Sequence, residues 1–303
     1  MISVSIGVCA YNEEKNIGNL LKALLTQQTD VVSIREIIIV SSGSTDKTDE
    51  IVNFYSKLDS RIRLIRQKRR EGKASAVNEI LKRAKCEVCV LESADTIPLP
   101  RTIERLCVPF LKDDVGMCGG HPIPINGGKS LVGRVGSVLW ELHHRISLKK
   151  PKMGELVAFR NIIDEIPKDT AVDEAWIEAE IRRRGYRVLY VPDAICYNKC
   201  PETFGDYLKQ RRRIHAGHLH LKDRVGYEVA TMNVVTVLKE LIGLVVEKPR
   251  LIPVIAIAVL LEFVGRMLGY VDYVRGRDHV VWDIAETTKD LGVSYDEKIE
   301  ISP

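Results

Sequence analysis

The chain lacks a strong excess of either charge. Its 303 residues include 45 Lys and Arg and 41 Asp and Glu, which gives a formal net charge of +4. A balance this mild does not indicate a nucleic-acid-binding protein. The basic residues are nevertheless clustered in three runs, at Lys68–Arg70, Arg182–Arg184 and Arg211–Arg213. Such runs usually lie on solvated faces, but they also suit phosphate-bearing ligands or an anionic membrane surface.

A secretory signal and an internal repeat are also missing. Met1–Tyr11 has no basic segment and runs directly into a strand pattern. The seven cysteines are scattered, and an odd set without a signal is typical of a reducing cytosol. Cys86/Cys89 and Cys196/Cys200 have loosely metal-like spacing. Because Cys89 lies within an apolar run, we interpret these residues as buried hydrophobes.

Apolar runs alternate with helically spaced apolar residues along the first hundred residues. The pattern predicts strands at Val4–Cys9, Glu36–Val40, Ile62–Arg66 and Val88–Leu91, with helices at Asn16–Thr26, from about residue 46 to 57, and at Gly72–Ala84. This order predicts an α/β fold with a mostly parallel, Rossmann-like sheet and helices on both faces. After Pro100 the pattern predicts helices at Thr102–Phe110, Leu131–Leu148, Asp173–Arg184 and Phe204–Leu221, and strands at Val115–His121, Val157–Arg160 and Tyr186–Val191.

The stretch Glu87–Pro100 contains the first candidate site residue. Its apolar run, Val88–Leu91, breaks into polar residues that end at Asp95, and two prolines follow. Ligands of open α/β sheets bind at the carboxyl ends of the strands, where Asp95 would lie. A carboxylate there suits a divalent ion and a diphosphate. The alternative is that Asp95 only caps the next turn or helix.

Two long apolar stretches, Val229–Val246 and Leu251–Val271, lie near the end of the chain. Each is about long enough to cross a bilayer, but both carry charges, which cost roughly 2.5–3.5 kcal/mol near its centre. Only Glu247–Arg250 separates them, so a tight hairpin would draw cations through the membrane. We expect membrane attachment, by a shallow hairpin, an interfacial pair or one spanning helix. A pair of core or dimer-interface helices is the alternative.

Polar segments follow the predicted strands in a set order. They are Ala10–Glu14, Ser42–Thr48, Gly72–Asn78 and Ser93–Thr96, and later Gly154–Arg160, Asp173–Gly185 and Gln210–Arg213. Their order and spacing resemble those of the family-2 glycosyltransferases, which have a GT-A fold. The resemblance covers roughly residues 1–220. It implies an enzyme that moves a sugar from a nucleotide diphosphate to an acceptor with the help of Mg²⁺ or Mn²⁺.

The resemblance implies that Asp95 is the metal ligand. In the family, an Asp-x-Asp turn after the fourth strand holds the metal, which compensates the charge of the diphosphate. Here the turn is Ser93-Ala94-Asp95, so only the second acid is present. The missing partner leaves the strength of metal binding, and the identity of the metal, open.

Other segments are implied to bind the donor. Ala10, Tyr11 and Glu13 would hold the nucleoside at the end of the first strand. The family usually has two acids where this chain has Ser41 and Ser42, and serines form hydrogen bonds without acting as anions. Lys73 lies near a helix start, where its charge and the helix dipole both favour anions. The alternative for Lys73 is a solvated side chain.

The acidic pair Asp173-Glu174 is the candidate catalytic base. Inverting transfer needs a carboxylate to take the proton of the acceptor hydroxyl. The family places this base in an acidic pair before a helix, and alignment on Gly185 puts Glu174 at the usual position. Either acid could serve, and the alternative is that both complement the helix dipole, which contributes about 0.3–1 kcal/mol.

The segment Gln210–Ile214 approaches the Gln-x-x-Arg-Trp motif of processive polysaccharide synthases. Ile214 replaces the tryptophan, which weakens the processive interpretation, while Arg213 is implied to pair with the diphosphate. His215 and His218 are three residues apart on a predicted helix. A metal role is one interpretation, but we favour a surface helix, and we interpret His143-His144 in the same way.

We therefore expect an inverting glycosyltransferase with its catalytic domain at residues 1–222, a membrane-associated segment at 223–274 and a polar tail at 275–303. The expected acceptor is lipid-linked or a polysaccharide, at the cytoplasmic face of the cell membrane. A nucleotidyltransferase is less well supported, because no glycine-rich basic loop follows the first strand. A non-catalytic sugar-nucleotide-binding or scaffold protein is the alternative suggested by the serines at positions 41, 42 and 93.

Overall fold

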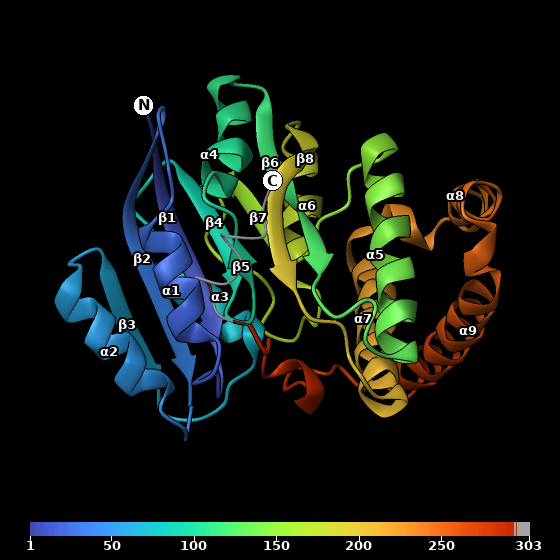
Figure 1. Ribbon diagram of the computed structural model, residues 1–303. Coiled ribbons are helices and arrows are strands. Elements are labelled where there is room, and N and C mark those ends of the chain that lie inside the picture. Colours follow the sequence, from blue (N-terminus) through green and yellow to red (C-terminus); the bar gives the residue numbers. More distant parts are fainter. Residues whose placement is uncertain (294, 296–303) are drawn as a thin grey trace.

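The computed structural model describes residues 1–293 and 295. Within them, one sheet of eight strands runs in the order β3-β2-β1-β4-β7-β6-β8-β5 (Figure 1). The strands are β1 (Ile2–Ala10), β2 (Val32–Ser42), β3 (Ile62–Gln67), β4 (Val88–Ser93), β5 (Ile97–Pro98), β6 (Val115–Pro124), β7 (Leu156–Arg160) and β8 (Arg187–Asn198). β1 to β4 are mutually parallel, whereas β7 is antiparallel to both of its neighbours.

Helices cover both faces of this sheet, which confirms the predicted fold class. They are α1 (Ile17–Leu25), α2 (Thr48–Leu58), α3 (Lys73–Leu81), α4 (Thr102–Cys107), α5 (Leu131–Lys149), α6 (Asp173–Arg183), α7 (Phe204–Val225), α8 (Val234–Glu247) and α9 (Ile252–Val274). α8 begins later than the apolar pattern predicts, because the side chain of Asn233 caps it by accepting a hydrogen bond from Thr236 N (2.9 Å).

The run Glu36–Val40 in β2 shows why the sheet is buried on both sides. Successive side chains of a strand point to opposite faces. Ile37 and Ile39 pack with the apolar side chains of α1, whereas Ile38 and Val40 pack with those of α3 and α6. A continuous apolar run, rather than an alternating one, is therefore required at the centre of a sheet with two helical layers.

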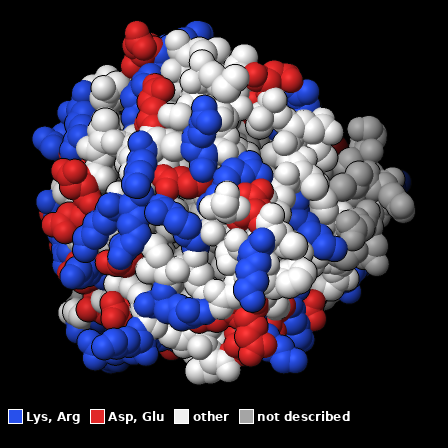
Figure 2. Space-filling model, turned by 90° about the vertical axis from the view of Figure 1, so that its left-hand side faces the viewer, with Lys and Arg blue, Asp and Glu red and all other residues white. Residues whose placement is uncertain are grey.

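The face formed by β3 and α2 is charged and solvated. Figure 2 shows Lys and Arg interspersed with Asp and Glu on this side. Arg66 pairs with Asp49 there (2.7 Å), and Arg63 pairs with Glu36. Mixed charges of this kind keep a surface soluble without creating a large field of one sign.

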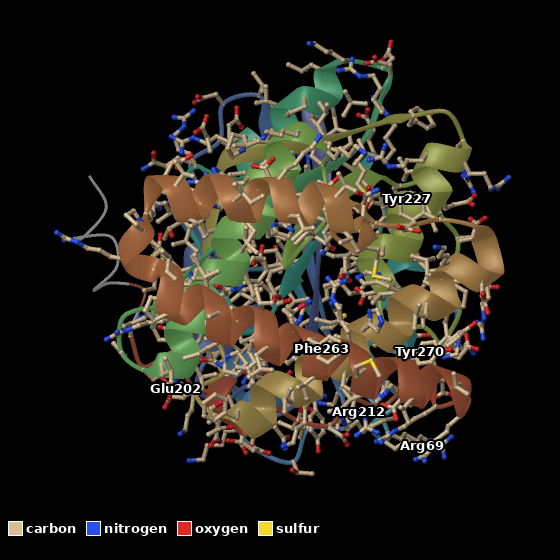
Figure 3. All side chains as sticks on the ribbon, turned by 90° about the vertical axis from the view of Figure 1, so that its right-hand side faces the viewer. Arg69, Glu202, Arg212, Tyr227, Phe263 and Tyr270 are labelled. Atoms are coloured by element: carbon tan, nitrogen blue, oxygen red, sulfur yellow. The ribbon has the colours of Figure 1, made fainter. Side chains whose placement is uncertain are left out.

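On the opposite side of the molecule, α5, α7, α8 and α9 form a separate helical layer (Figures 1 and 3). Its core contains Val135, Leu142, Tyr207 and Leu244 from α5, α7 and α8, and apolar residues of α9 pack with them. Gly269 of α9 lets this helix approach α7, since a side chain there would collide with the backbone of Arg212. The two helices after residue 222 thus pack directly on the rest of the chain. The predicted division into domains remains a prediction.

Candidate active site

The carboxyl ends of β1, β2 and β4 open into a cavity of about 660 Å³. Its lining includes all the residues predicted to bind the donor or the metal: Ala10, Tyr11, Glu13, Ser42, Lys73, Asp95 and Arg213. Glu174 lines the same cavity, whereas Asp173 lines a small pocket that shares Lys73 and Glu174 with it. The fold thus brings together residues that are up to 203 positions apart, from Ala10 to Arg213.

Hydrogen bonds join the turns after β1 and β2. The side chain of Asn12, a residue with φ 51°, accepts a hydrogen bond from Thr45 N (2.8 Å). Glu13 N donates to Thr48 Oγ1 (2.7 Å), and Ser42 Oγ accepts from Glu71 N (3.1 Å). Ser42 therefore links the end of β2 to the segment before α3 by a hydrogen bond, which a neutral hydroxyl can accept.

Carboxylates are concentrated around the turn after β4. Ser93 Oγ donates a hydrogen bond to Glu155 Oε2 (3.0 Å), which brings this second acid next to the Ser93–Asp95 turn. Burial, and then the charge of Asp95, raises the pKa of Glu155. The same two causes raise the pKa of Glu13 to about 7. Burial raises the pKa of Glu92 to about 8, and its Oε2 has no hydrogen-bond partner in the described residues. These acids repel one another, so a bound cation would relieve the repulsion.

A divalent ion fits this turn if the ligand completes its coordination. Residues 1–293 and 295 contain no group of three His, Cys, Asp or Glu side chains that could hold a metal by themselves. Mg²⁺ is commonly bound by one or two carboxylates together with phosphate oxygens, and Asp95 and Glu155 can supply the carboxylates. Glu155 is absent from the sequence prediction, since nothing in the pattern places it beside Ser93.

The two acids at the start of α6 differ in their surroundings. Asp173 Oδ2 lies 3.1 Å from Lys73 Nζ, and the Asp173 side chain is only 3% exposed. Glu174 faces the main cavity, where burial and the neighbouring Asp173 raise its pKa to about 7. Glu174 therefore remains the candidate general base that faces the cavity, whereas Asp173 is already paired. Lys73 is not the solvated side chain of the alternative interpretation.

The basic run Arg211–Arg213 does not lie on a solvated face. Arg211 donates to Glu262 of α9 (3.0 Å), and Arg212 pairs with Asp272 of the same helix. The guanidinium of Arg213 lies over the ring of Trp282, 3.3 Å from its centroid. The first two arginines hold α9 in place, and Arg211 and Arg213 both line the cavity.

Residues 277–293, which we call the C-terminal strap, return over the cavity. Trp282 and Lys289 line it, and Lys289 Nζ donates to Tyr11 O (2.7 Å) and pairs with Glu13. Thr287 N donates to Asp206 Oδ2 (3.1 Å), which ties the strap to α7. The sequence prediction of a polar tail missed this role, although a tryptophan within a polar segment is a signal for a contact.

A family model now identifies the chain. The model described as "Glycosyl transferase family 2" matches residues 5–178. The chain belongs to this family. It is therefore a glycosyltransferase, and the resemblance drawn from the ordered polar segments is confirmed.

Sequence relatives of this family-2 glycosyltransferase include poly-beta-1,6-N-acetyl-D-glucosamine synthases. The one from Staphylococcus aureus (strain COL) is 27% identical over 226 residues, which cover 70% of this chain and 53% of that protein. The one from Staphylococcus epidermidis is 24% identical over 229 residues, covering 71% and 54%. The chain thus spans about half the length of the curated relatives that it matches.

Solved structures confirm the GT-A fold of this glycosyltransferase. The mannosyltransferase PcManGT from Pyrobaculum calidifontis, in complex with GDP-Man and Mn²⁺, superposes with a TM-score of 0.67 at 20% identity. The superposition covers 90% of this chain and 87% of that chain. S. aureus TarS 1-349 gives a TM-score of 0.51 at 16% identity, with 91% and 92% covered.

The histidines of this glycosyltransferase correct the prediction of surface helices. His143 is 7% and His218 is 6% exposed, and both line the cavity, as does the partly buried His215. Of the histidines so predicted, only His144 lies outside the lining, where its Nδ1 lies 2.8 Å from the hydroxyl of Tyr190. Lys152 also lines the cavity and was missed by the prediction, because no motif of the family contains it.

Proposed function

We propose that this enzyme transfers a sugar, with inversion, from a nucleotide-diphosphate sugar to a lipid-linked or polysaccharide acceptor at the cytoplasmic face of the cell membrane. One observation carries the proposal. A single cavity contains the predicted donor residues, the candidate base Glu174, and apolar side chains of α5, α8 and α9. A donor and an acceptor with an apolar part can therefore meet beside one carboxylate.

The donor would occupy the end of the cavity near β1 and β4. Tyr11, Glu13 and Ser42 line the part suited to the nucleoside, while Lys73 and Arg213 supply cations for the diphosphate. Asp95 and Glu155 would hold Mg²⁺ or Mn²⁺, which supplies charge compensation for the diphosphate when it is bound. PcManGT was solved with GDP-Man and Mn²⁺, which supports a divalent metal here.

Glu174 would take the proton from the acceptor hydroxyl. Because its pKa is raised to about 7, it is a stronger base than an ordinary glutamate and is still ionised in a large fraction of molecules near neutral pH. Asp173 would act differently, by fixing Lys73 through their 3.1 Å contact. Of the two acids predicted as alternative bases, Glu174 would thus be the base and Asp173 a positioning residue.

An apolar surface on α8 and α9 supports attachment to a membrane. By length and composition, Pro249–Val274 is able to cross a bilayer, with a mean hydropathy of 2.2. Its polar side, however, is held by α7 through the pairs Arg211–Glu262 and Arg212–Asp272. We infer that α9 lies in the membrane surface rather than across it. The exposed apolar residues are Val234, Val235, Leu238, Ile242 and Val246 of α8, and Ile252, Val259, Leu260, Phe263, Met267, Tyr270, Val271 and Val274 of α9. Phe263 and Tyr270 are labelled in Figure 3.

Calorimetry on the purified full chain in mild detergent tests the donor part of this proposal. UDP-, GDP- and dTDP-sugars are each titrated with and without Mn²⁺. We expect one of them to bind only with the metal, and Asp95→Ala to abolish that binding. Asp113→Ala, at an exposed acid, is the matched control. Failure of folded protein to bind any donor would favour the scaffold alternative, and the anomeric configuration of the product, read by NMR, tests inversion.

A further inference from the structure

Four basic side chains that are not among the predicted donor residues form a cluster on the cavity wall. They are His143 of α5, Lys152 in the loop before β7, and Arg211 and His218 of α7. All four line the cavity, and the charge of Lys152 acts on both histidines. Three separate segments of the chain thus converge, and the sequence alone gives no sign of it.

His218 is the side chain that points to a ligand. It is only 6% exposed, it lines the cavity, and its Nδ1 has no hydrogen-bond partner in the described residues. Buried nitrogen atoms normally have a partner, because an unpaired one loses its hydration without compensation. A ligand atom in the cavity would provide the missing partner.

Lys152 adds a positive charge to this wall. Its Nζ donates to Met153 O (3.1 Å), a neutral carbonyl, so the ammonium retains donors for another group. Arg211 lies nearby, although Glu262 already neutralises it. A half-buried cation near an unpaired nitrogen favours an anionic ligand over a neutral sugar.

The cluster is near both the candidate base and apolar side chains of the cavity. The charges of Glu174 and Lys152 act on each other. The ring of His143 lies 5.2 Å from that of Trp140, centroid to centroid. Leu142 of α5, Leu241 of α8 and Phe263 of α9 also line the cavity, and Phe263 is 63% exposed (Figure 3). A ligand that fits both parts has an anionic head and an apolar chain.

We propose that His143, Lys152 and His218 bind the phosphate head of an isoprenoid-like lipid acceptor whose chain leaves between α5, α8 and α9. This inference rests on the proposed function, since it names the acceptor of the same site. The donor diphosphate would have its own cations, Lys73 and Arg213, which line the same cavity. Lipid monophosphates and lipid diphosphates both fit this site, because each carries a phosphate ester on an apolar chain.

Calorimetry on the full chain tests the inference with farnesyl phosphate and farnesyl diphosphate as probes, and farnesol and inorganic phosphate as comparisons. A saturating nucleoside diphosphate with Mn²⁺ is present throughout to occupy the donor site. We expect one of the two phosphate esters to bind at least about tenfold more tightly than farnesol or phosphate, because only it uses both parts. The tighter ester identifies the head.

His218→Leu and Lys152→Met are the informative variants, with His144→Leu and Lys150→Met as matched controls outside the cavity. We expect each informative variant to weaken binding of the ester at least about tenfold, because each removes one donor to a charged group. The controls should leave it unchanged. His218→Leu should not lower the melting temperature, since no hydrogen bond of Nδ1 is lost, whereas a purely structural histidine would do so.

Three results would overturn the inference. Farnesol could bind as tightly as the esters, the variants could bind the esters like the wild type, or the nucleotide could prevent ester binding by competition. Donor binding with Mn²⁺, measured on the same samples, distinguishes failure of the lipid phosphate site from failure of the proposed glycosyl transfer. Intact donor binding without ester binding refutes only the lipid phosphate site, whereas loss of both in the wild type refutes the glycosyl-transfer proposal itself.

Discussion

Lys73 Nζ and Asp173 Oδ2 lie 3.1 Å apart, and they join the first residue of α3 to the first residue of α6. This ion pair separates the roles of two adjacent acids. Asp173 is buried against a lysine, while Glu174 is left facing the cavity. The pairing also keeps Lys73 charged, because Asp173 and Glu174 raise its pKa against the effect of burial.

Substitution of the two acids should give different kinetic defects. We expect Glu174→Gln to lower kcat by about 10²–10⁴ with little change in donor affinity, because it removes only the base. Asp173→Asn should instead weaken donor binding and lower stability, since Lys73 loses its buried partner. Turnover and calorimetry on both variants check this. Equal loss of kcat with intact donor binding in both would contradict the division of roles.

The pH dependence should follow Glu174. The base works only when ionised, and its pKa is raised to about 7, so kcat should rise with pH and level off above about 7. A pH profile of turnover at saturating donor measures this. The residual activity of Glu174→Gln should lack the rise, and a wild-type profile that levels off near the ordinary pKa of glutamate would contradict the assignment.

Glu92 should lower the free energy of unfolding of the protein at alkaline pH. Its pKa is raised from 4.5 to about 8, so the folded state holds the proton more tightly than the unfolded state does. The free energy of unfolding therefore falls as the pH rises between these values. We expect Glu92→Gln to raise stability by at least about 1 kcal/mol at pH 8, and by less at pH 6. Urea unfolding at both pH values checks the sign.

Glu155 should compensate for the serine at position 93. With a nucleoside diphosphate present, Glu155→Gln should weaken Mn²⁺ binding about tenfold or more, as the loss of a carboxylate near a metal does. Ser93→Asp in the Glu155→Gln background should restore it, because the lost acid returns to the neighbouring position. Calorimetric titration of Mn²⁺ measures both effects. Unchanged metal binding in Glu155→Gln would exclude this acid.

Trp282 should hold the C-terminal strap over the cavity. Its ring stacks on Arg213 and its carbonyl accepts a hydrogen bond from Arg70 (2.5 Å). We expect Trp282→Ala to speed limited proteolysis within residues 277–293 and to raise the rate of donor association, because cation–π contacts of about 0.5–2 kcal/mol are lost. Val281→Ala, at a neighbouring residue that is 47% exposed, is the control and should change neither rate.

The exposed apolar surface should bind membranes. Ile242→Glu and Leu260→Glu together replace two side chains that are 62% and 60% exposed and do not line the cavity. We expect this double variant to lose sedimentation with anionic vesicles while keeping donor binding. Phe54→Glu with Leu58→Glu on α2, at similarly exposed apolar residues, should keep both. Equal vesicle binding by both double variants would refute the surface.

The sequence predicts the fold, and a set of residues that line one cavity, for a physical reason. Strand β2, the turn after it and Asp95 are local features, because burial on both faces and the end of a strand leave a pattern over a few residues. Glu155 and His218 leave no such pattern, since their roles depend on contacts between distant segments. Trp282 is a signal for a contact, but its partner Arg213 is distant in the sequence and could not be named. Asp173 and Glu174 could be told apart only once Lys73 was placed.

The contacts of Lys289 with Tyr11 and Glu13 connect two distant parts of the described chain, because Lys289 and Glu13 are 276 positions apart. A ribosome therefore makes Tyr11 and Glu13 long before it makes Lys289. The sheet and most of the family segment at residues 5–178 can form while the strap is still unmade. In the nascent enzyme, Glu13 therefore lacks its lysine partner until Lys289 has emerged, so this side of the cavity is completed only after the sheet.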